Sequence, residues 1–377
     1  MLSIWEKESF YAPQDVIIIG AGLMGLWSAL ELKKKNDALR ITILERNTIP
    51  LGASTRNAGF ACFGSPTELI CDAETSGADN MLAVAEMRYK GIEKIRTYFA
   101  DAVIAFDLCG GYECINKDYK YWDALNDRIA WLNATLQPIT HRKNTFRRTD
   151  EKLATLGLQG FDCLLENKTE AALHSGKLVQ ALTSKVQSLG VTILYGMELE
   201  RWENNKDVVS IYTKQNIQLQ SHRLLFCTNG FTPALGEGLP VKPARGQVIV
   251  TSPIEGLALK GTFHYDEGFY YWRNLGNRVL LGGARNTAFE EEETTDLAGS
   301  MPVKRALEDF LKTHLHPKYQ YTIEHHWSGI MGFTADKKPF VGQAGPNAMA
   351  AIACNGMGVA LTPMIAEKVA AKLLADF

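Results

Sequence analysis

Residues 16–19 read Val-Ile-Ile-Ile and lead directly into Gly20, Gly22 and Gly25. Consecutive β-branched residues bounded by glycine predict a short buried strand, and the amphipathic segment 26–35 that follows predicts a helix. In such a turn the first glycine permits the tight bend, the second lets the backbone approach a pyrophosphate, and the third lets the helix pack on the strand. The start of the helix offers unpaired N–H groups to phosphates. This unit therefore predicts dinucleotide binding.

A second predicted strand, 41–44, ends at Glu45, twenty positions after Gly25. An acidic side chain at this place can accept hydrogen bonds from both ribose hydroxyls of an adenosine. The glycine motif alone would be weak evidence, since its glycines could serve only to pack a structural turn. Strand, glycines, helix, strand and acid in register make the interpretation much more specific.

The bulk composition excludes several classes of protein. A chain of 377 residues is long enough for two domains and a large core. A net charge of −2 with 22% charged residues provides no electrostatic footprint for nucleic acid or anionic lipid. No apolar run is long enough to cross a membrane, and the first residues lack the features of a signal peptide. We expect a cytoplasmic protein with no nucleic-acid partner and no transmembrane segment.

The seven cysteines are scattered, and their odd number argues against a full disulfide framework. Cys109 and Cys114 are the closest pair, with four residues between them and no histidine nearby. No Cys-x-x-Cys motif or Cys/His cluster indicates zinc or an iron–sulfur centre. We expect buried thiols in a reducing cytosol, and no metal.

Two further segments are rich in small residues. Segment 51–65 holds three glycines and three alanines, and it predicts neither a good helix nor a good strand. Small residues are typical where the backbone must approach a flat group closely. Residues 349–354 predict a buried strand that leads into Asn-Gly-Met-Gly-Val at 355–359 and a helix at about 362–374. The chain therefore ends in a second strand–glycine–helix element.

Hydrophobic periodicity predicts the remaining elements. The expected helices span about 80–99, 122–136 and 176–189. The expected strands are a pair within 103–115, interrupted by Gly110 and Gly111, and segments 191–194, 208–213, 217–219, 224–230, 246–251, 268–273 and 278–282.

Several other motifs accompany the glycine turn and Glu45-Arg46. They read GASTRNAGF at 52–60, SGKLV at 175–179, PARGQ at 243–247, WSG at 327–329, TADKKP at 334–339 and NGMGVA at 355–360. In order and spacing they are similar to motifs of the FAD-dependent amino-acid and amine oxidoreductases related to D-amino-acid oxidase, glycine oxidase and sarcosine oxidase. The Gly-Ala-Ser-x-Arg-Asn motif is similar to that of the branch that includes the γ-glutamylputrescine oxidoreductases.

The resemblance implies an α/β fold with two domains. A discontinuous, Rossmann-like FAD-binding domain would take residues 1–75, 165–235 and 325–377. A second α+β substrate domain, built on a mixed sheet, would take residues 76–164 and 236–324.

The resemblance also assigns residues to FAD. The cofactor-binding set is Gly20, Gly22, Gly25, Glu45, Arg46, Ser54, Thr55, Arg56, Asn57, Ala58, Gly59, Phe60, Leu199, Gly332, Asn355, Gly356, Met357, Gly358 and Val359. The backbone of Leu199 would meet adenine, and Arg46 would flank adenine or simply be solvated at the end of its strand. Some sarcosine oxidases bind flavin through a cysteine near the Trp-Ser-Gly segment, but none occurs between 328 and 343. We therefore expect non-covalent FAD.

The implied reaction is oxidation of a carbon–nitrogen bond by hydride transfer to flavin N5, giving an imine that hydrolyses. Relatives place a substrate-facing tyrosine at Tyr270 or Tyr271, and strand alternation sends these two side chains to opposite faces. Amino-acid oxidases of this family also bind the substrate carboxylate through an arginine shortly after Trp-x-Gly, where this chain has Met331. Another cation would be needed for a carboxylated substrate. Arg285 is the first choice, before the alternatives Arg245, Arg273 and Arg56.

Alternatives remain open at this point. An NAD(P)-dependent dehydrogenase would share the first glycine motif, although not the two later segments of small residues. A flavoprotein without turnover would share them all. The partners we expect are a small amine or amino-acid substrate and oxygen or another electron acceptor. The sequence leaves open the substrate's identity and chirality, the acceptor and the oligomeric state.

Overall fold

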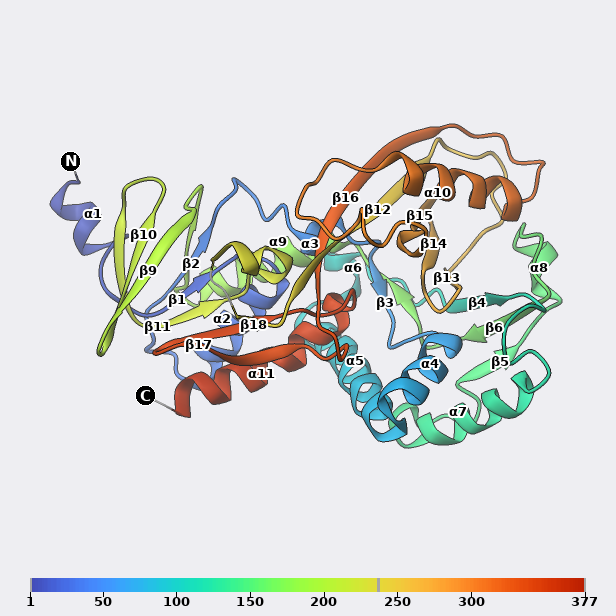
Figure 1. Cartoon of the computed structure of the whole chain (residues 1–377), viewed down its shortest axis with the longest axis horizontal. Coiled ribbons are helices and arrows are strands. Elements are labelled where there is room, and N and C mark those ends of the chain that lie inside the picture. The colour runs from blue at the N-terminus through green and yellow to red at the C-terminus, as the bar shows by residue number, and fades with distance from the viewer. Residues whose placement is uncertain (1, 236–237, 376–377) are drawn as a thin grey trace. The chain divides into compact units, whose positions relative to one another are not determined.

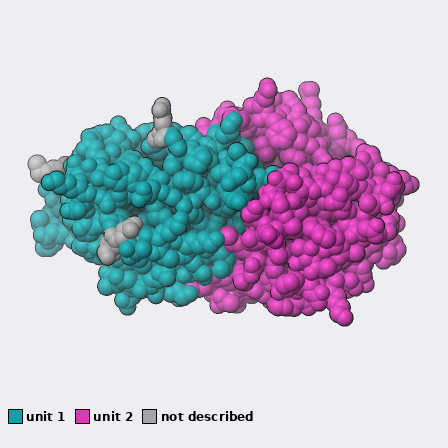
Figure 2. Space-filling view, turned by 60° about the horizontal axis from the view of Figure 1, so that its bottom comes forward, with its two compact units in different colours: residues 1–56, 175–244, 330–377 teal, residues 57–174, 245–329 magenta. Residues whose placement is uncertain are grey.

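The computed structural model describes residues 2–235 and 238–375 (Figure 1). The chain divides into two compact units, which Figure 2 colours separately. The first unit is assembled from residues 1–56, 175–244 and 330–377, and the second from residues 57–174 and 245–329. Each unit is built on its own large sheet.

The first unit contains an eight-stranded sheet with the order β17-β18-β11-β1-β2-β8, and the β9–β10 hairpin pairs with β11. Strands β18, β11, β1, β2 and β8 are mutually parallel. The elements are α1 (Ile4–Glu8), β1 (Gln14–Ile19), α2 (Leu23–Lys35), β2 (Ile41–Glu45), α3 (Ala53–Arg56), α9 (Ser175–Ser188), β8 (Thr192–Tyr195), β9 (Leu199–Asn205), β10 (Val208–Thr213), β11 (Gln218–Phe226), η1 (Asn229–Leu235), β17 (Phe340–Gly345), β18 (Ala348–Ile352) and α11 (Gly358–Ala375).

The residues of β1 explain why it lies in the middle of this sheet. Ile17 and Ile19 join an apolar cluster with residues of the β9–β10 hairpin, whereas Ile18 contacts α2 on the other face. A strand buried on both faces needs apolar residues at every position, and 16–19 provide them. Helix α2 packs against both α9 and α11.

The second unit contains a mixed sheet with the order β16-β12-β15-β14-β13-β4-β6-β5, and a separate pair, β3–β7. The elements are β3 (Phe60–Ala61), α4 (Pro66–Ser76), α5 (Ala78–Tyr98), α6 (Asp101–Ile104), β4 (Gly111–Ile115), α7 (Leu125–Thr140), β5 (Phe146–Arg148), α8 (Lys152–Thr155), β6 (Cys163–Asn167), β7 (Ala171–Ala172), β12 (Lys242–Thr251), β13 (Thr262–Tyr265), β14 (Tyr270–Leu275), β15 (Arg278–Gly283), η2 (Arg285–Thr287), α10 (Met301–His314) and β16 (Ile323–Phe333).

The two faces of this second sheet are covered differently. One face carries aromatic and aliphatic side chains, among them Phe263 and Trp272, that pack with Phe310 of α10. The opposite face is apolar at its β4–β6–β5 end, where residues of α4, α5 and α7 complete a second core. Near its β12–β15–β14 end lies a small cluster that includes the half-buried Phe60, Tyr271 and Trp327.

The α/β fold class expected from the sequence is confirmed, but one expected strand is wrong and one helix was missed. Residues 103–104 belong to the short helix α6 rather than to a strand, and only β4 forms within the expected pair. Ala105 adopts a left-handed conformation, φ 48°, that ends α6 immediately. Helix α10 was not predicted, although Val303, Leu307 and Leu311 have helical spacing.

The unit boundaries also differ from the expected domain boundaries. Residues 57–75 and 165–174 belong to the second unit, as do 325–329, whereas the described residues 238–244 belong to the first. The physical reason is pairing: β3 pairs with β7, and α4 packs against α5, so these segments stay with the mixed sheet.

Candidate functional site

The first unit gathers its candidate cofactor residues at one edge of its sheet. Strands β2, β1, β11 and β18 are adjacent and parallel, so their carboxyl ends lie along the same edge. Glu45, Gly20, Asn229 and Asn355 end or follow these four strands in that order. Ligands of open α/β sheets bind at this edge, because the loops there leave a crevice and the helices that follow point their N-termini toward it.

The glycine turn has no room for a side chain at Gly20 or Gly25, because backbone atoms lie too close. A β-carbon on Gly25 would lie 2.0 Å from the carbonyl oxygen of Gly20, and one on Gly20 would lie 2.9 Å from the carbonyl oxygen of Cys227. The backbone N–H of Leu23 donates to Oγ of Ser54 over 2.9 Å. Helix α3 is thereby held against the start of α2, and the Ser54 hydroxyl lies at the predicted phosphate site.

Glu45 is buried beside the same turn. Its carboxylate accepts the backbone N–H of Ala21 over 3.1 Å and that of Asn47 over 3.1 Å. The guanidinium carbon of Arg46 lies 3.9 Å from the ring centroid of Phe231, so this exposed side chain stacks on that ring. The side chain of Leu199 is buried in the core of the unit. The Thr55 hydroxyl donates to the carbonyl of Pro50 and thus shapes the loop before α3.

The second glycine element is connected to the strand ends by side-chain amides. Asn355 accepts the N–H of Thr334 through Oδ1 and donates its own N–H to the carbonyl of Gly332. Oδ1 of Asn229 accepts the N–H of Ala353, and a β-carbon on Gly332 would lie 2.6 Å from that same oxygen. These contacts fix the chain from 353 to Gly358, where α11 begins. Asn229 was not predicted as a site residue, although it follows a predicted strand.

Asn57, Ala58, Gly59 and Phe60 belong to the second unit rather than the first. Oδ1 of Asn57 accepts the N–H of Gly59, whose φ of 73° suits glycine. Nη1 of Arg273 donates to the carbonyls of Gly59 and Leu173 over 2.9 and 3.0 Å. The guanidinium of Arg273 therefore supports the backbone that carries Phe60.

Tyr270 and Tyr271 point to opposite faces of the second sheet. The ring of Tyr270 stacks on Phe310 of α10 with a centroid distance of 4.5 Å and an angle of 13°, so it packs in that core. Tyr271 lies on the other face and meets Phe60 edge to face at 6.0 Å. Gly282, opposite Tyr271 on β15, leaves space for its ring. The alternation expected from the sequence thus separates the two side chains.

Arg285 lies near Tyr271. Burial raises the pKa of the Tyr271 hydroxyl to about 12, and the charge of Arg285 acts in the opposite direction. Burial also lowers the pKa of the Arg285 guanidinium, which nevertheless stays protonated because its ordinary value is so high. The guanidinium carbon lies 4.8 Å from the ring centroid of Phe289. A half-buried cation beside a half-buried tyrosine is suited to hold an anionic group.

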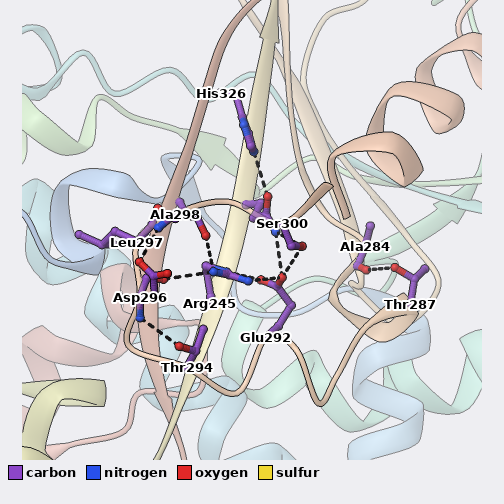
Figure 3. A network of polar contacts seen from close by, with 12 residues as sticks. Arg245, Ala284, Thr287, Glu292, Thr294, Asp296, Leu297, Ala298, Ser300 and His326 are labelled. Atoms are coloured by element: carbon purple, nitrogen blue, oxygen red, sulfur yellow. Dashed lines mark hydrogen bonds and ion pairs between the residues drawn. The ribbon is translucent and has the colours of Figure 1, made fainter. Parts of the chain in front are cut away.

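Arg245 has a structural role. Its Nε and Nη2 form a bidentate pair with the fully buried Glu292 at 2.9 and 2.8 Å, and Nη1 donates to the carbonyl of Ala298 (Figure 3). Ser300 donates to the same carboxylate over 2.6 Å. Gln247 links Glu292 to the imidazole of His326. This network attaches the loop between η2 and α10 to β12.

The residues of the first unit fit an FAD molecule. Glycines without room for a β-carbon, the carboxylate of Glu45 and the hydroxyl of Ser54 surround the predicted pyrophosphate and ribose sites. Asn355 to Gly358 present backbone N–H groups and a helix start at the same edge of the sheet. This arrangement would hold the phosphates of a dinucleotide.

A sequence profile described as "FAD dependent oxidoreductase" matches residues 15–372. This protein belongs to that family. It is similar to the probable oxidoreductase OrdL of Haemophilus influenzae, at 23% identity over 96% of this chain and 83% of that protein. It is also similar to the L-2-hydroxyglutarate dehydrogenase of Escherichia coli, at 24% identity over 80% of this chain and 73% of that protein.

The fold of this FAD-dependent oxidoreductase is shared with solved structures. Glycine oxidase from Geobacillus kaustophilus superposes with a TM-score of 0.75 at 18% identity, covering 97% of this chain and 95% of that one. Iminodiacetate oxidase from Chelativorans sp. BNC1 gives a TM-score of 0.74 at 16% identity, covering 96% and 95%. The FAD cofactor, the enzyme class and the α/β fold expected from the sequence are confirmed.

One further structural finding concerns membranes. Among residues 2–235 and 238–375, no helix combines the length and the apolar character that crossing a bilayer requires.

Proposed function

We propose that this oxidoreductase oxidises a carbon–nitrogen bond of a small amine or amino acid. The first unit would bind FAD non-covalently, and the second would supply the substrate-contacting side chains. Bound FAD would supply the hydride acceptor for the carbon that bears nitrogen, and the imine product would hydrolyse to a carbonyl compound and ammonia or an amine.

One observation carries this proposal: the half-buried guanidinium of Arg285 lies beside the half-buried Tyr271. A carboxylate needs a cation when it leaves water, and the hydroxyl of Tyr271 can donate a further hydrogen bond because it stays protonated. Three alternatives are less suitable. Arg245 is paired with Glu292, Arg273 donates to backbone carbonyls, and Arg56 belongs to α3 in the first unit.

Met331 provides a second argument for Arg285 as the carboxylate-binding residue. It stands where amino-acid oxidases of the family carry their carboxylate-binding arginine, and its sulfur lies 3.8 Å from the position of a β-carbon on Gly356. A thioether cannot stabilise a carboxylate. The substrate is therefore either anchored by Arg285 or lacks a carboxylate next to the reacting carbon, as in the γ-glutamylputrescine branch that the Gly-Ala-Ser-x-Arg-Asn motif resembles.

One relative is an L-2-hydroxyglutarate dehydrogenase, whose name indicates that it acts on a hydroxy acid. Solved structures of the same fold include glycine oxidase, iminodiacetate oxidase and L-proline dehydrogenase, whose names indicate amino-acid or imino-acid substrates. We favour nitrogen compounds because of these structures and the motif. A second, non-catalytic candidate has no observation in its favour.

Anaerobic addition of candidate substrates to the purified holoenzyme tests the proposal. The panel contains glycine, N-methyl amino acids, D-amino acids, polyamine derivatives and, as a contrast, L-2-hydroxy acids. Bleaching of the flavin by at least one nitrogen compound is expected. Bleaching by hydroxy acids alone would contradict the proposal, as would a flavin that no compound bleaches but dithionite reduces normally.

The electron acceptor is tested on the substrate so found. Hydrogen peroxide formed in step with product indicates oxygen, whereas rapid bleaching without peroxide indicates a quinone or an electron-transfer protein. Acid precipitation should leave all flavin in the supernatant, because no cysteine is available between 328 and 343 for a covalent link. We place the enzyme in the cytoplasm, on the expectation that its scattered thiols stay reduced.

A further inference from the structure

Three potential metal ligands of the second unit come together in its interior. Sγ of Cys62, a carboxylate oxygen of Glu170 and an imidazole nitrogen of His264 all lie within 4.8 Å of one another. The three side chains are buried, with exposed fractions of 3%, 2% and 6% for the whole residues. We propose that Cys62, Glu170 and His264 form a binding site for one divalent cation of the zinc class. The proposal is independent of the reaction proposed above.

The fold brings these residues together through strand register. Phe60 pairs with Ala172 and Ala61 with Ala171 in the antiparallel β3–β7 pair. Continuing this register by one residue places Cys62 opposite Glu170. His264 comes from β13 of the large sheet, so a bound ion would fasten the β3–β7 pair to that sheet.

The carboxylate of Glu170 is positioned before any ion binds. It accepts a hydrogen bond from Oγ1 of Thr262 over 2.7 Å and lies 2.6 Å from Nε2 of His264. A β-carbon on Gly111 would lie 2.4 Å from the carboxyl carbon of Glu170, so only glycine leaves room for the acid here. Glycine at 111 and the Thr262 hydroxyl thus act as supports for one ligand, as is usual around metal sites.

The donor set favours zinc over calcium or magnesium. Thiolate, imidazole and carboxylate together are typical of Zn²⁺, whereas Ca²⁺ and Mg²⁺ prefer oxygen ligands alone. Bonds of roughly 2.0–2.3 Å at tetrahedral angles separate ligand atoms by roughly 3–4 Å, so the present spacing requires only small side-chain movements. With three protein ligands, the fourth position falls to a solvent molecule.

The charges balance in the bound state. A thiolate, a carboxylate, a neutral imidazole and a dication sum to zero, which suits a buried site. Binding requires that Cys62 lose its thiol proton and that any proton shared by His264 and Glu170 also leave, and both protons go to solvent. No local sequence pattern indicates this site, because its ligands lie on three distant segments and match no zinc motif.

The site would also affect the neighbouring apolar cluster. The ring of His264 meets Phe60 edge to face at a centroid distance of 5.3 Å, and Phe60 in turn meets Tyr271 at 6.0 Å. A metal bound to the imidazole would therefore hold in place the ring that packs against Phe60, and through Phe60 it would restrict the cluster that contains Tyr271.

Metal content is the first test. The holoprotein is produced in medium supplemented with zinc chloride, since buried ligands take up their ion during folding, and is then desalted in chelator-treated buffer. Mass spectrometry should find one zinc per chain in the wild type and in Cys114→Ala, a buried thiol of the same unit outside the cluster. Cys62→Ala and His264→Gln should each lose this zinc.

Cobalt provides a readout that needs no substitution. Holoprotein produced with cobalt should show a thiolate–cobalt charge-transfer band in its difference spectrum against the zinc form. A folded, flavin-containing wild type that carries neither zinc nor cobalt overturns the proposal. So does a zinc content that Cys62→Ala and His264→Gln leave unchanged, or a cobalt spectrum without the thiolate band. None of these measurements depends on substrate turnover, so they are separate from the test of the proposed function.

Discussion

Tyr271 and Gly282 are paired across β14 and β15, and a β-carbon on Gly282 would lie 2.4 Å from Cε2 of the Tyr271 ring. The missing side chain of Gly282 therefore sets the position of the tyrosine. The atoms that such a β-carbon would meet are Cε2, Cζ and the hydroxyl of Tyr271, so the ring can swing aside without unfolding the sheet.

Gly282→Ala should displace the Tyr271 ring while preserving fold and flavin content. We expect kcat/KM to fall roughly tenfold, which corresponds to about 1.4 kcal/mol of transition-state stabilisation. Steady-state kinetics and the ratio of flavin to protein absorbance measure both effects. Tyr270→Phe is the matched control and should leave kcat/KM unchanged, since Tyr270 packs on Phe310. Wild-type kinetics in Gly282→Ala would show that ring position does not matter.

Gly25→Ala should abolish FAD binding. Its β-carbon would lie 2.0 Å from the carbonyl oxygen of Gly20, a backbone atom that cannot move aside cheaply. Gly52→Ala serves as the control, because no heavy atom lies within 4 Å of its β-carbon position. Flavin absorbance of the purified proteins, with circular dichroism for folding, distinguishes the two. A fully yellow Gly25→Ala protein would contradict the proposed phosphate site.

Arg285→Ala should raise the KM for a carboxylated substrate roughly ten- to hundredfold, the loss of one charge-assisted pair. The KM for an amine without a carboxylate should stay the same. Arg285→Lys should recover part of the affinity, since it keeps the charge but not the bidentate geometry. Arg305→Ala, an exposed arginine on α10, is the control. An unchanged KM for Arg285→Ala would remove this residue as the anion partner.

Ionisation of the buried Glu113 carboxyl should lower the free energy of unfolding as pH rises. Burial raises the pKa of its carboxyl to about 7, against hydrogen bonds from Thr67 and Ser65 and the charge of His264, which lower it. A carboxyl with a raised pKa stabilises the fold fully below its unfolded value, and this contribution is lost as pH rises through about 7. The shift corresponds to about 3 kcal/mol.

Glu113→Gln removes this titration. Urea unfolding at pH 5, 7 and 8 should show a smaller loss of unfolding free energy with pH for the variant than for the wild type. Glu255→Gln, at an exposed position, should follow the wild type. Parallel pH profiles for Glu113→Gln and wild type would show that Glu113 is not responsible.

The parts of the structure that the sequence predicted are those encoded locally. The turn from Gly20 to Gly25 and the acid at Glu45 depend on short-range spacing, and the structure places them together. Alternation separated Tyr270 from Tyr271, but choosing between their faces required knowing where α10 packs. Of the strand pair expected within 103–115, the first strand does not form, because Val103 and Ile104 continue the short helix that begins at Asp101.

Other features depend on long-range register, which no local pattern contains. The support of Gly59 by Arg273 and the pairing of Arg245 with Glu292 join segments far apart in the chain. The Cys62–Glu170–His264 cluster likewise exists only because two sheets bring three segments together. The amphipathic pattern of α10, by contrast, was present in the sequence and could have been found.

The contact between α2 and α11 has a consequence for biosynthesis. The helix that follows the first glycine turn emerges early from the ribosome, but its packing partner, Gly358–Ala375, is translated long afterwards. The apolar surface of α2 that packs against α11 therefore stays exposed to solvent during most of translation, and chaperones can bind it there. A premature stop codon just before α11 would leave that surface permanently bare, and the truncated product would aggregate.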